Sequence, residues 1–325
     1  MSSEVILEVK NLVKNYPLTS RGIFLKKEVG VVHAVDGVSF SVRKGETFGL
    51  VGESGCGKTS TARAILYLDP PTSGEVYFEG QDLVKIFKSN NPQEILKLRR
   101  KMQYVFQNPY ASLDPRMTVA DIITEPFVIH KHVPKEKWND RLYELLELVG
   151  LEDYHAERYP HEFSGGQRQR ICIARALAVE PRLLIADEPV ASLDVSVRAQ
   201  ILNLLQELQR KFGMADLSTV KHICHKVAVM YLGKFVEIAE TDELFSSPLH
   251  PYTQALLSAI PIPDPENRRS RIVLPGEVPS PINPPAGCRF HPRCVYAKEY
   301  KCMEKAPELV DVGGGHLVAC NKVSS

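Results

Sequence analysis

Alternating apolar and polar residues mark several strands along the chain. VILEVKNLVKNY, from Val5 to Tyr16, alternates as a half-buried strand does. GVSFSVRKGETFGLV predicts two more strands around a turn at Lys44-Gly45, and EVYFEGQDL predicts another strand. VAVMYLGKFVEIAE predicts a hairpin that turns at Gly233. These segments supply the strands of the expected fold.

Helical spacing dominates the middle of the chain. Residues 93–160 are expected to be mostly helical, and RLYELLELVGL shows the pattern with apolar residues three and four positions apart. RLLIAD, which ends at Asp187, is a short apolar run typical of a fully buried strand. Strands that alternate with helices and are followed by a separate tail predict an α/β core with insertions.

Composition narrows the class of protein. Hydrophobic residues make up 44% of the 325 residues and charged residues 24%, as in soluble globular proteins. The net charge of +1 gives no general electrostatic reason to bind nucleic acid. No apolar run approaches the ~20 residues of a membrane span, and the N-terminus lacks the pattern of a signal peptide. We therefore expect a cytoplasmic protein, in which disulfides are rare.

A glycine-rich stretch, GLVGESGCGKTSTARAIL, contains the spacing G-x-x-x-x-G-K-[ST] in Gly52, Gly57, Lys58 and Thr59. A predicted strand precedes it and a predicted helix follows, which is the context that a phosphate-binding loop needs. Glycines allow successive N–H groups to converge on an anion, and the helix start adds its positive dipole end. Lys58 could bridge the β- and γ-phosphates, and Thr59 could bind Mg²⁺. A simple glycine turn before a helix is the alternative, and the flanking elements argue against it.

Two acidic residues, Asp187 and Glu188, follow the buried strand RLLIA. The carboxyl edge of a parallel sheet is where α/β proteins bind ligands. Asp187 is expected to hold Mg²⁺, through water, and Glu188 is expected to orient and deprotonate the attacking water. The alternative is that both residues cap the next helix. The phosphate loop upstream argues against it, because the loop and the acidic pair together suit phosphoryl transfer.

A second anion-binding helix start is predicted by FSGGQRQRICIARALA. One nucleotide needs only one phosphate-binding loop, which we call the cradle. A second anion-binding site therefore indicates that this helix start meets a nucleotide held by another subunit. Here the chain resembles the ATP-binding subunits of ABC transporters. Ser164-Gly165-Gly166-Gln167 matches their signature motif, with Phe163 where leucine is commoner. Gln107 matches the Q-loop, Ala191-Ser192-Leu193-Asp194 matches the D-loop, and Tyr16 stands where an adenine-stacking aromatic is expected.

This resemblance covers about residues 4–250 and implies a P-loop NTPase (RecA-like) α/β core. It also implies an antiparallel β subdomain, an α-helical subdomain inserted at about 95–165, and a Cys-containing C-terminal extension. Residues 1–250 would form the ABC ATPase domain and residues 251–325 the extension. Glu188, Lys58 and Gln107 would be catalytic, and Thr59, Gln107 and Asp187 would bind Mg²⁺. ATP would be bound by Tyr16, Gly52, Glu53, Ser54, Gly55, Cys56, Gly57, Lys58, Thr59 and Ser60.

The resemblance also implies partners. Two such subunits, homologous or identical, would pair head to tail, with each ATP between the cradle of one and the SGGQ helix of the other. Two membrane-spanning permease subunits would form a separate channel, an extracytoplasmic substrate-binding protein would act indirectly, and no nucleic acid is involved. The chain would then be peripheral, on the cytoplasmic face of the cell membrane.

Further segments, SPLHPYTQALLSAIP and LPGEVPSPINPPAGCRFHPRC, resemble the oligopeptide and dipeptide importer branch. We therefore expect an ATPase that powers peptide import. Relatives in that branch also import nickel, sugars or glutathione-like compounds, and selectivity lies in other subunits. A soluble ABC ATPase of DNA repair, translation or regulation is the main alternative, and a cluster-dependent redox protein is another, which the intact Asp187-Glu188 pair disfavours.

Four of the seven cysteines, Cys288, Cys294, Cys302 and Cys320, lie in the last 38 residues. Neither short interval fits the C-x2-4-C spacing of zinc pairs. A [4Fe–4S] cluster also takes four cysteines, and the resemblance implies one. Zinc, or free thiols and disulfides, remain alternatives. Eleven of the 23 prolines lie from Pro248 to Pro292, so this segment is expected to be extended and poor in helix. Because the tail is remote in sequence from both cradles, we expect ATPase activity to survive cluster loss better than stability does.

Cys56 lies inside the glycine-rich loop, beside Gly57 and Lys58. A helix start and a nearby lysine both favour the thiolate. We therefore expect Cys56 to react readily with alkylating reagents, with loss of ATP binding and protection by bound ATP.

One expected strand is missing from KFGMADLSTVKH. ABC ATPases have a buried strand after the D-loop helix, ending in a histidine that contacts the γ-phosphate. Only Met214 and Ala215 separate the predicted helix end at Gly213 from Asp216, and the next helix would be capped at Asp216 or Ser218. His222 and His225 would both lie in that helix. We therefore predict that the sequence omits about six or seven residues, a typical strand, and that the chain is broken between Met214 and Asp216. A true deletion is the alternative.

Overall fold

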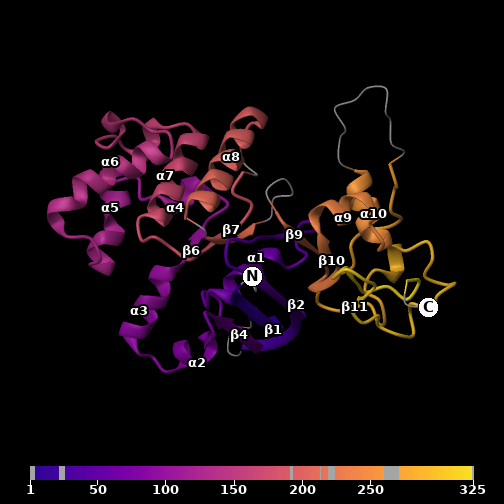
Figure 1. Ribbon diagram of the computed structural model, residues 1–325. Coiled ribbons are helices and arrows are strands. Elements are labelled where there is room, and N and C mark those ends of the chain that lie inside the picture. The colour runs from indigo at the N-terminus through magenta and orange to yellow at the C-terminus, as the bar shows by residue number, and fades with distance from the viewer. Residues whose placement is uncertain are drawn as a thin grey trace, which may run out of the picture. The chain divides into compact units, whose positions relative to one another are not determined.

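The computed structural model describes residues 4–21, 26–190, 193–212, 214–218, 224–259 and 271–323. Contacts divide the chain into two compact units, and many of their elements are labelled in Figure 1. Unit one comprises Met1–Leu7, Val42–Thr47 and Phe78–Ile223, and unit two comprises Glu8–Ser41, Phe48–Tyr77 and Cys224–Ser325.

Unit one has a parallel arrangement of β6 (Met102–Val105), β7 (Leu183–Ala186) and β8 (Ala215–Ser218). Every residue of β7 is buried, which confirms the strand predicted from RLLIAD. The short strand β5 (Gln81–Asp82) also belongs to this unit. The carboxyl end of β7 leads directly into Asp187.

Helices fill most of unit one, as the apolar spacing predicted. They are α2 (Leu83–Lys88), α3 (Pro92–Lys101), α4 (Pro109–Ser112), α5 (Val119–His130), α6 (Trp138–Leu148), α7 (Gly165–Leu177) and α8 (Val195–Phe212). Short 3-10 turns occur at Lys135–Lys137, Asp153–His155 and Pro160–Glu162. Helices α5, α6 and α7 pack on one another (Figure 1), with Ile122, Phe127 and Leu146 fully or almost fully buried. This apolar packing holds the helix that starts with the SGGQ motif.

Strand β8 corrects the expectation that no strand lies between the two helices around residue 215. Ala215 pairs in register with Leu183 and Ser218 with Ala186, so the polar segment ADLS forms the parallel neighbour of β7. Pairing satisfies backbone N–H and C=O groups whatever side chains the segment carries. Ala215 and Asp216 are consecutive residues of one strand, so the break predicted next to Asp216 is not there.

Unit two contains most of β1 (Val5–Arg21), β2 (Lys26–Arg43) and β4 (Ser73–Phe78), in the order β2-β1-β4. A second sheet has β3 (Thr47–Val51) parallel to β9 (Lys226–Tyr231), and β9 antiparallel to β10 (Lys234–Glu240). The predicted hairpin at Gly233 is therefore confirmed. Short strands β12 (Leu317–Val318) and β11 (Val310–Asp311) extend this sheet beyond β10.

The helices of unit two are α1 (Lys58–Ile65), α9 (Thr241–Ser246) and α10 (Pro251–Ser258), with a 3-10 turn at His291–Arg293. Helix α10 lies inside the proline-rich segment that was predicted to be poor in helix. Pro251 occupies the first turn, where its missing N–H has no helical partner to lose, and His250 caps the helix by accepting from the N–H of Tyr252.

None of the helices that the structure describes combines the length and the apolar character needed to cross a membrane.

Candidate functional site

The glycine-rich loop connects β3 to α1, as the motif predicted. Gly57 is the N-cap residue of α1 and has a φ of 117°, a conformation that favours glycine. Close approach also requires glycine: a Cβ at Gly52 would overlap the carbonyl oxygen of Met230, and one at Gly57 would overlap that of Ala34. The backbone of β9 and β2 therefore lies against the loop. Only glycine at these two positions leaves enough room for the loop.

Lys58 folds back into this loop. Its Nζ donates to the carbonyl oxygens of Gly52 at 2.9 Å and of Glu53 at 3.4 Å, and the residue is 8% exposed. A buried ammonium needs such acceptors because it has left water. Thr59, the next residue, is exposed at the start of α1.

Cys56 contradicts the expectation of a reactive thiolate. The residue is 4% exposed, and burial raises the pKa of its thiol. Lys58, whose Nζ lies 3.8 Å from Sγ, lowers that pKa by less than burial raises it. The motif places Cys56 at the start of a helix, which would lower the pKa of its thiol. The motif does not show that the side chain is buried.

We expect iodoacetamide to alkylate Cys56 of the folded protein several-fold more slowly than the same cysteine in the unfolded chain. The thiolate is the reacting form, and burial both reduces its population and blocks access. Timed labelling at pH 8, followed by peptide mass spectrometry, would measure this, with Cys56→Ser to assign the peptide. Equal rates in folded and unfolded protein, with protection by ATP, would instead support a reactive thiolate.

Tyr16 lies in β1, between β2 and β4 in the sheet order. Its hydroxyl donates to Asp69 Oδ2 at 3.2 Å, and Lys14 Nζ lies 4.7 Å from the ring centroid. Partial burial raises the pKa of its hydroxyl, while a hydrogen bond with Ser60 lowers it. Tyr16, Asp69 and Ser60 are therefore brought together beside the first turn of α1.

The acidic pair lies in unit one at the end of β7. Asp187 is 5% exposed, and its Oδ2 accepts from the hydroxyl of Tyr104 at 2.7 Å. Glu188 has a φ of 44°, and its Oε2 accepts from Gln107 Nε2 at 2.8 Å. The sequence predicted Asp187, Glu188 and Gln107, and the structure brings all three together. It places Gln107 against Glu188.

Tyr104 was missed by the motif analysis. It belongs to β6, three residues before Gln107, and pairs in register with Ile185 of β7. Neighbouring parallel strands end at the same edge of a sheet. A polar residue near the end of β6 could therefore have indicated a side chain close to Asp187.

The SGGQ motif begins α7 as predicted. Ser164 Oγ accepts from the N–H of Gln167 at 3.3 Å, and Gln167 Oε1 accepts from the N–H of Ser164 at 3.1 Å. A Cβ at Gly166 would overlap Val197 of α8, so the small residue is required by packing. In the D-loop, Leu193 is buried and Asp194 is exposed, whereas Ala191 and Ser192 lie outside the described residues.

The switch-histidine prediction has a mixed outcome. His225 forms a bend directly before β9, so its expected place in a helix is wrong. His222 lies outside the described residues.

The four tail cysteines all belong to unit two. Among the described residues, no three His, Cys, Asp or Glu side chains form a group that could hold a metal ion. The pKa of the Cys288 thiol is raised to about 11, first by burial and then by the charges of the other three tail cysteines. Cys294 and Cys320 likewise raise the pKa of the Cys302 thiol after burial. The four thiols therefore lie near enough for their charges to interact.

Two further contacts of the glycine-rich loop were not predicted. The N–H of Glu53 donates to the hydroxyl of Tyr252 at 2.9 Å, and the Glu53 carboxylate is ion-paired with Arg293. Both partners come from the C-terminal region, so a tail that is remote from the loop in sequence contacts it in the folded chain. The sequence signal for this contact was Glu53 itself. A carboxylate in a loop that binds phosphate needs a cation beside it.

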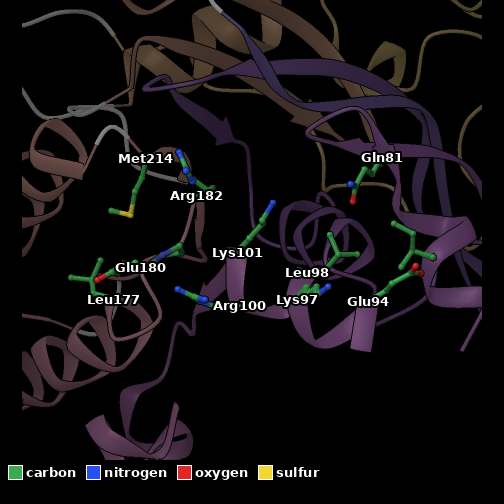
Figure 2. A pocket seen from close by; sticks show the side chains of 12 residues that line it. Gln81, Glu94, Lys97, Leu98, Arg100, Lys101, Leu177, Glu180, Arg182 and Met214 are labelled. Atoms are coloured by element: carbon green, nitrogen blue, oxygen red, sulfur yellow. The ribbon is translucent and has the colours of Figure 1, made fainter. Parts of the chain in front are cut away.

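A cavity of about 890 Å³ lies in unit one (Figure 2). Its cationic side chains are Lys97, Arg100, Lys101 and Arg182. Lys101 is paired with Glu79, and Arg100 donates to the carbonyl oxygen of Val179. None of the predicted nucleotide or acidic-pair residues that the structure describes lines this cavity, so it is not the motif-defined site.

Comparisons with known proteins give the family. A family model described as ABC transporter matches residues 35–191, and one described as oligopeptide/dipeptide transporter, C-terminal region, matches residues 236–302. The oligopeptide transport ATP-binding protein AppF of Bacillus subtilis (strain 168) is 51% identical over 333 residues, covering 99% of both chains. The chain belongs to the ABC transporter family.

Other ABC proteins agree with this placement. The dipeptide transport ATP-binding protein DppF of Escherichia coli (strain K12) is 49% identical, covering 97% of this chain and 93% of that one. Among solved structures, the ATP-binding cassette MJ0796, described as a dimer in a post-hydrolysis state with ADP and Pi, superposes with a TM-score of 0.62. It is 27% identical and covers 73% of this chain and 99% of its own. The predicted ABC cassette fold is therefore confirmed.

Proposed function

We propose that this chain is the ATP-hydrolysing subunit that powers the import of dipeptides or oligopeptides through a separate membrane channel. The observation that carries the proposal is the coexistence of two features in one chain. One is the ABC phosphate loop between β3 and α1. The other is the match of residues 236–302 to the C-terminal region of oligopeptide and dipeptide transporters. AppF and DppF, which carry peptide transport in their names, match over nearly the whole chain.

The roles proposed for the phosphate loop follow from its chemistry. The N–H groups of residues 52–60 and the start of α1 would bind the phosphates, and Lys58 would exchange its carbonyl acceptors for phosphate oxygens. Tyr16 would stack on adenine, with Lys14 on one face of its ring. Ser164, Gly165, Gly166 and Gln167 would contact the nucleotide held by the partner subunit.

The roles proposed for the acidic pair follow from its orientation. Glu188, with Gln107 fixing one carboxylate oxygen, would take the proton of the attacking water. Oxygen donors suit Mg²⁺, and Thr59, Asp187 and Gln107 would be its ligands. Bound Mg²⁺ would neutralise charge on the phosphate oxygens. Tyr104 would keep Asp187 in one rotamer through its hydrogen bond.

For the tail, we propose a [4Fe–4S] cluster on Cys288, Cys294, Cys302 and Cys320, with zinc as the alternative. Support comes from the donor set, which is four thiols in one unit, with Cys294, Cys302 and Cys320 near enough to Cys288 to raise the pKa of its thiol. Four thiolates are the usual ligand set of such a cluster. The cluster would fasten a proline-rich segment to its surroundings, in the region from 251 to 325 that follows the ATPase domain of residues 1–250.

The partners proposed are a second ABC ATPase subunit, identical or homologous, two membrane-spanning permease subunits and, indirectly, an extracytoplasmic substrate-binding protein. No nucleic acid is involved. The chain would act at the cytoplasmic face of the cell membrane as a peripheral subunit.

Co-purification tests this proposal. We expect the tagged chain, isolated from detergent-solubilised membranes of its own cells, to bring a multi-span membrane protein in stoichiometric amount. Mass spectrometry would identify it, and the tag alone on an unrelated soluble protein is the control. A chain that elutes only with soluble proteins would favour an ABC ATPase outside transport.

A further inference from the structure

The carboxylate of Glu53 is held by a cation from the C-terminal tail. Arg293 Nη1 donates to Glu53 Oε2 at 2.8 Å, and Nη2 lies 3.4 Å from Oε1. The side chain of Arg293 is 9% exposed and that of Glu53 is 32% exposed. A two-pronged ion pair with a buried guanidinium fixes direction as well as charge.

A second contact fixes the backbone of the same residue. The hydroxyl of Tyr252, in α10, accepts the N–H of Glu53 at 2.9 Å. Tyr252 is fully buried, and its ring packs against Tyr231 and Phe290 with centroids 4.7 and 5.5 Å away. Phe290 lies three residues before Arg293, so both contacts with Glu53 rest on one aromatic cluster.

Glu53 would harm phosphate binding if it were left unpaired. It follows Gly52 in the loop, and its carbonyl oxygen lies 3.4 Å from Lys58 Nζ. A free carboxylate here would repel phosphate and compete for the ammonium of Lys58. The loop also contains Gly55 and Gly57 at positive φ, and glycine-rich backbone is costly to order.

We propose that Arg293 and Tyr252 are positioning residues of the phosphate loop, through which the C-terminal tail sets the affinity for nucleotide. Arg293 neutralises Glu53 and fixes the position of its carboxylate, while Tyr252 fixes the loop backbone. The inference rests on the proposed function, in that the loop from Gly52 to Ser60 binds ATP. It adds that this site depends on residues some 200 positions away in sequence.

A double-mutant cycle tests the inference. Arg293→Met, Glu53→Gln and the double variant would be compared with wild type for the Kd of a fluorescent ATP analogue with Mg²⁺. We expect Arg293→Met to raise Kd about tenfold, the loss of one charge-assisted contact. The double variant should bind close to Glu53→Gln, because the neutral amide in both needs no cation. Arg293→Lys, which keeps the charge but not the fork, should lie between wild type and Arg293→Met.

His316→Ala is the matched control. His316 is as buried as Arg293, and its Nε2 lies 2.7 Å from Glu237 Oε1, so it also joins the tail to a core strand, but it does not touch the cradle. It should lower the melting temperature without changing Kd. An unchanged Kd in Arg293→Met, or an equal increase in Kd when Arg293→Met is added to wild type and to Glu53→Gln, would overturn the inference. Failure of the wild type itself to bind the analogue would instead overturn the proposed ATPase function.

Discussion

The Glu188→Gln variant should bind MgATP as wild type does and hydrolyse it about 10²–10⁴-fold more slowly, the usual contribution of a general base. Its amide oxygen can still accept from Gln107 Nε2, so the hydrogen bond at the end of β7 is preserved. Only the capacity to take a proton from water is lost. Phosphate release under saturating ATP would measure turnover, and a fluorescent ATP analogue would measure binding.

Two further variants serve as comparisons for Glu188→Gln. Lys58→Ala should weaken binding itself by about 1.5–3 kcal/mol, because it removes a charge-assisted contact. Glu180→Gln changes an acid of the same unit that is paired with Arg141 and lies outside the predicted site, so its turnover should equal wild type. Wild-type turnover in Glu188→Gln would show that another group acts as the base.

The phosphate loop was predictable because its chemistry is local. Gly52, Gly57 and Lys58 lie within seven residues, and the flanking strand and helix follow from spacing alone. The same holds for the SGGQ cap, where Ser164 and Gln167 satisfy one another across three residues. In contrast, the Glu53–Arg293 pair joins residues 240 positions apart, and no periodicity reports such a contact.

Burial explains the main error at the site. The motif places Cys56 beside a helix start and a lysine, and both would lower the pKa of its thiol. Desolvation acts in the opposite direction and is the larger cause. Desolvation depends on what β9 and β2 bring against the loop, which the sequence does not display.

Strand β8 shows how backbone pairing can override side-chain pattern. ADLS carries none of the long apolar run of a buried central strand, yet it pairs with β7 over its whole length. The register aligns Ser218 with Ala186, directly before Asp187. The alignment with AppF spans 333 residues, whereas this chain has 325, so that relative has residues that this chain lacks. Intact-protein mass would establish whether the predicted six or seven residues, about one strand, are present in the natural protein.

Substitution of one tail cysteine should remove the bound metal and weaken nucleotide binding together. Protein purified without oxygen should be brown, with about four irons and four sulfides per chain. Cys294→Ser should lose most of that iron, because a cluster needs all four thiolates. It should also raise the Kd for MgATP, since Cys294 directly follows Arg293 and limits where the guanidinium can reach Glu53. Metal analysis and fluorescent-nucleotide titration would measure the two effects on the same preparation.

Cys172→Ser is the control for this prediction. Cys172 is also buried, but it lies in α7 of unit one, where its Sγ is 3.2 Å from Ser112 Oγ. That variant should keep both its iron and its affinity. Stoichiometric zinc in colourless wild-type protein would favour the zinc alternative, since Zn²⁺ also binds four thiolates. Wild-type protein with neither metal would mean that the tail cysteines are free thiols, and the loss of affinity in Cys294→Ser would then have to come from the position of Arg293 alone.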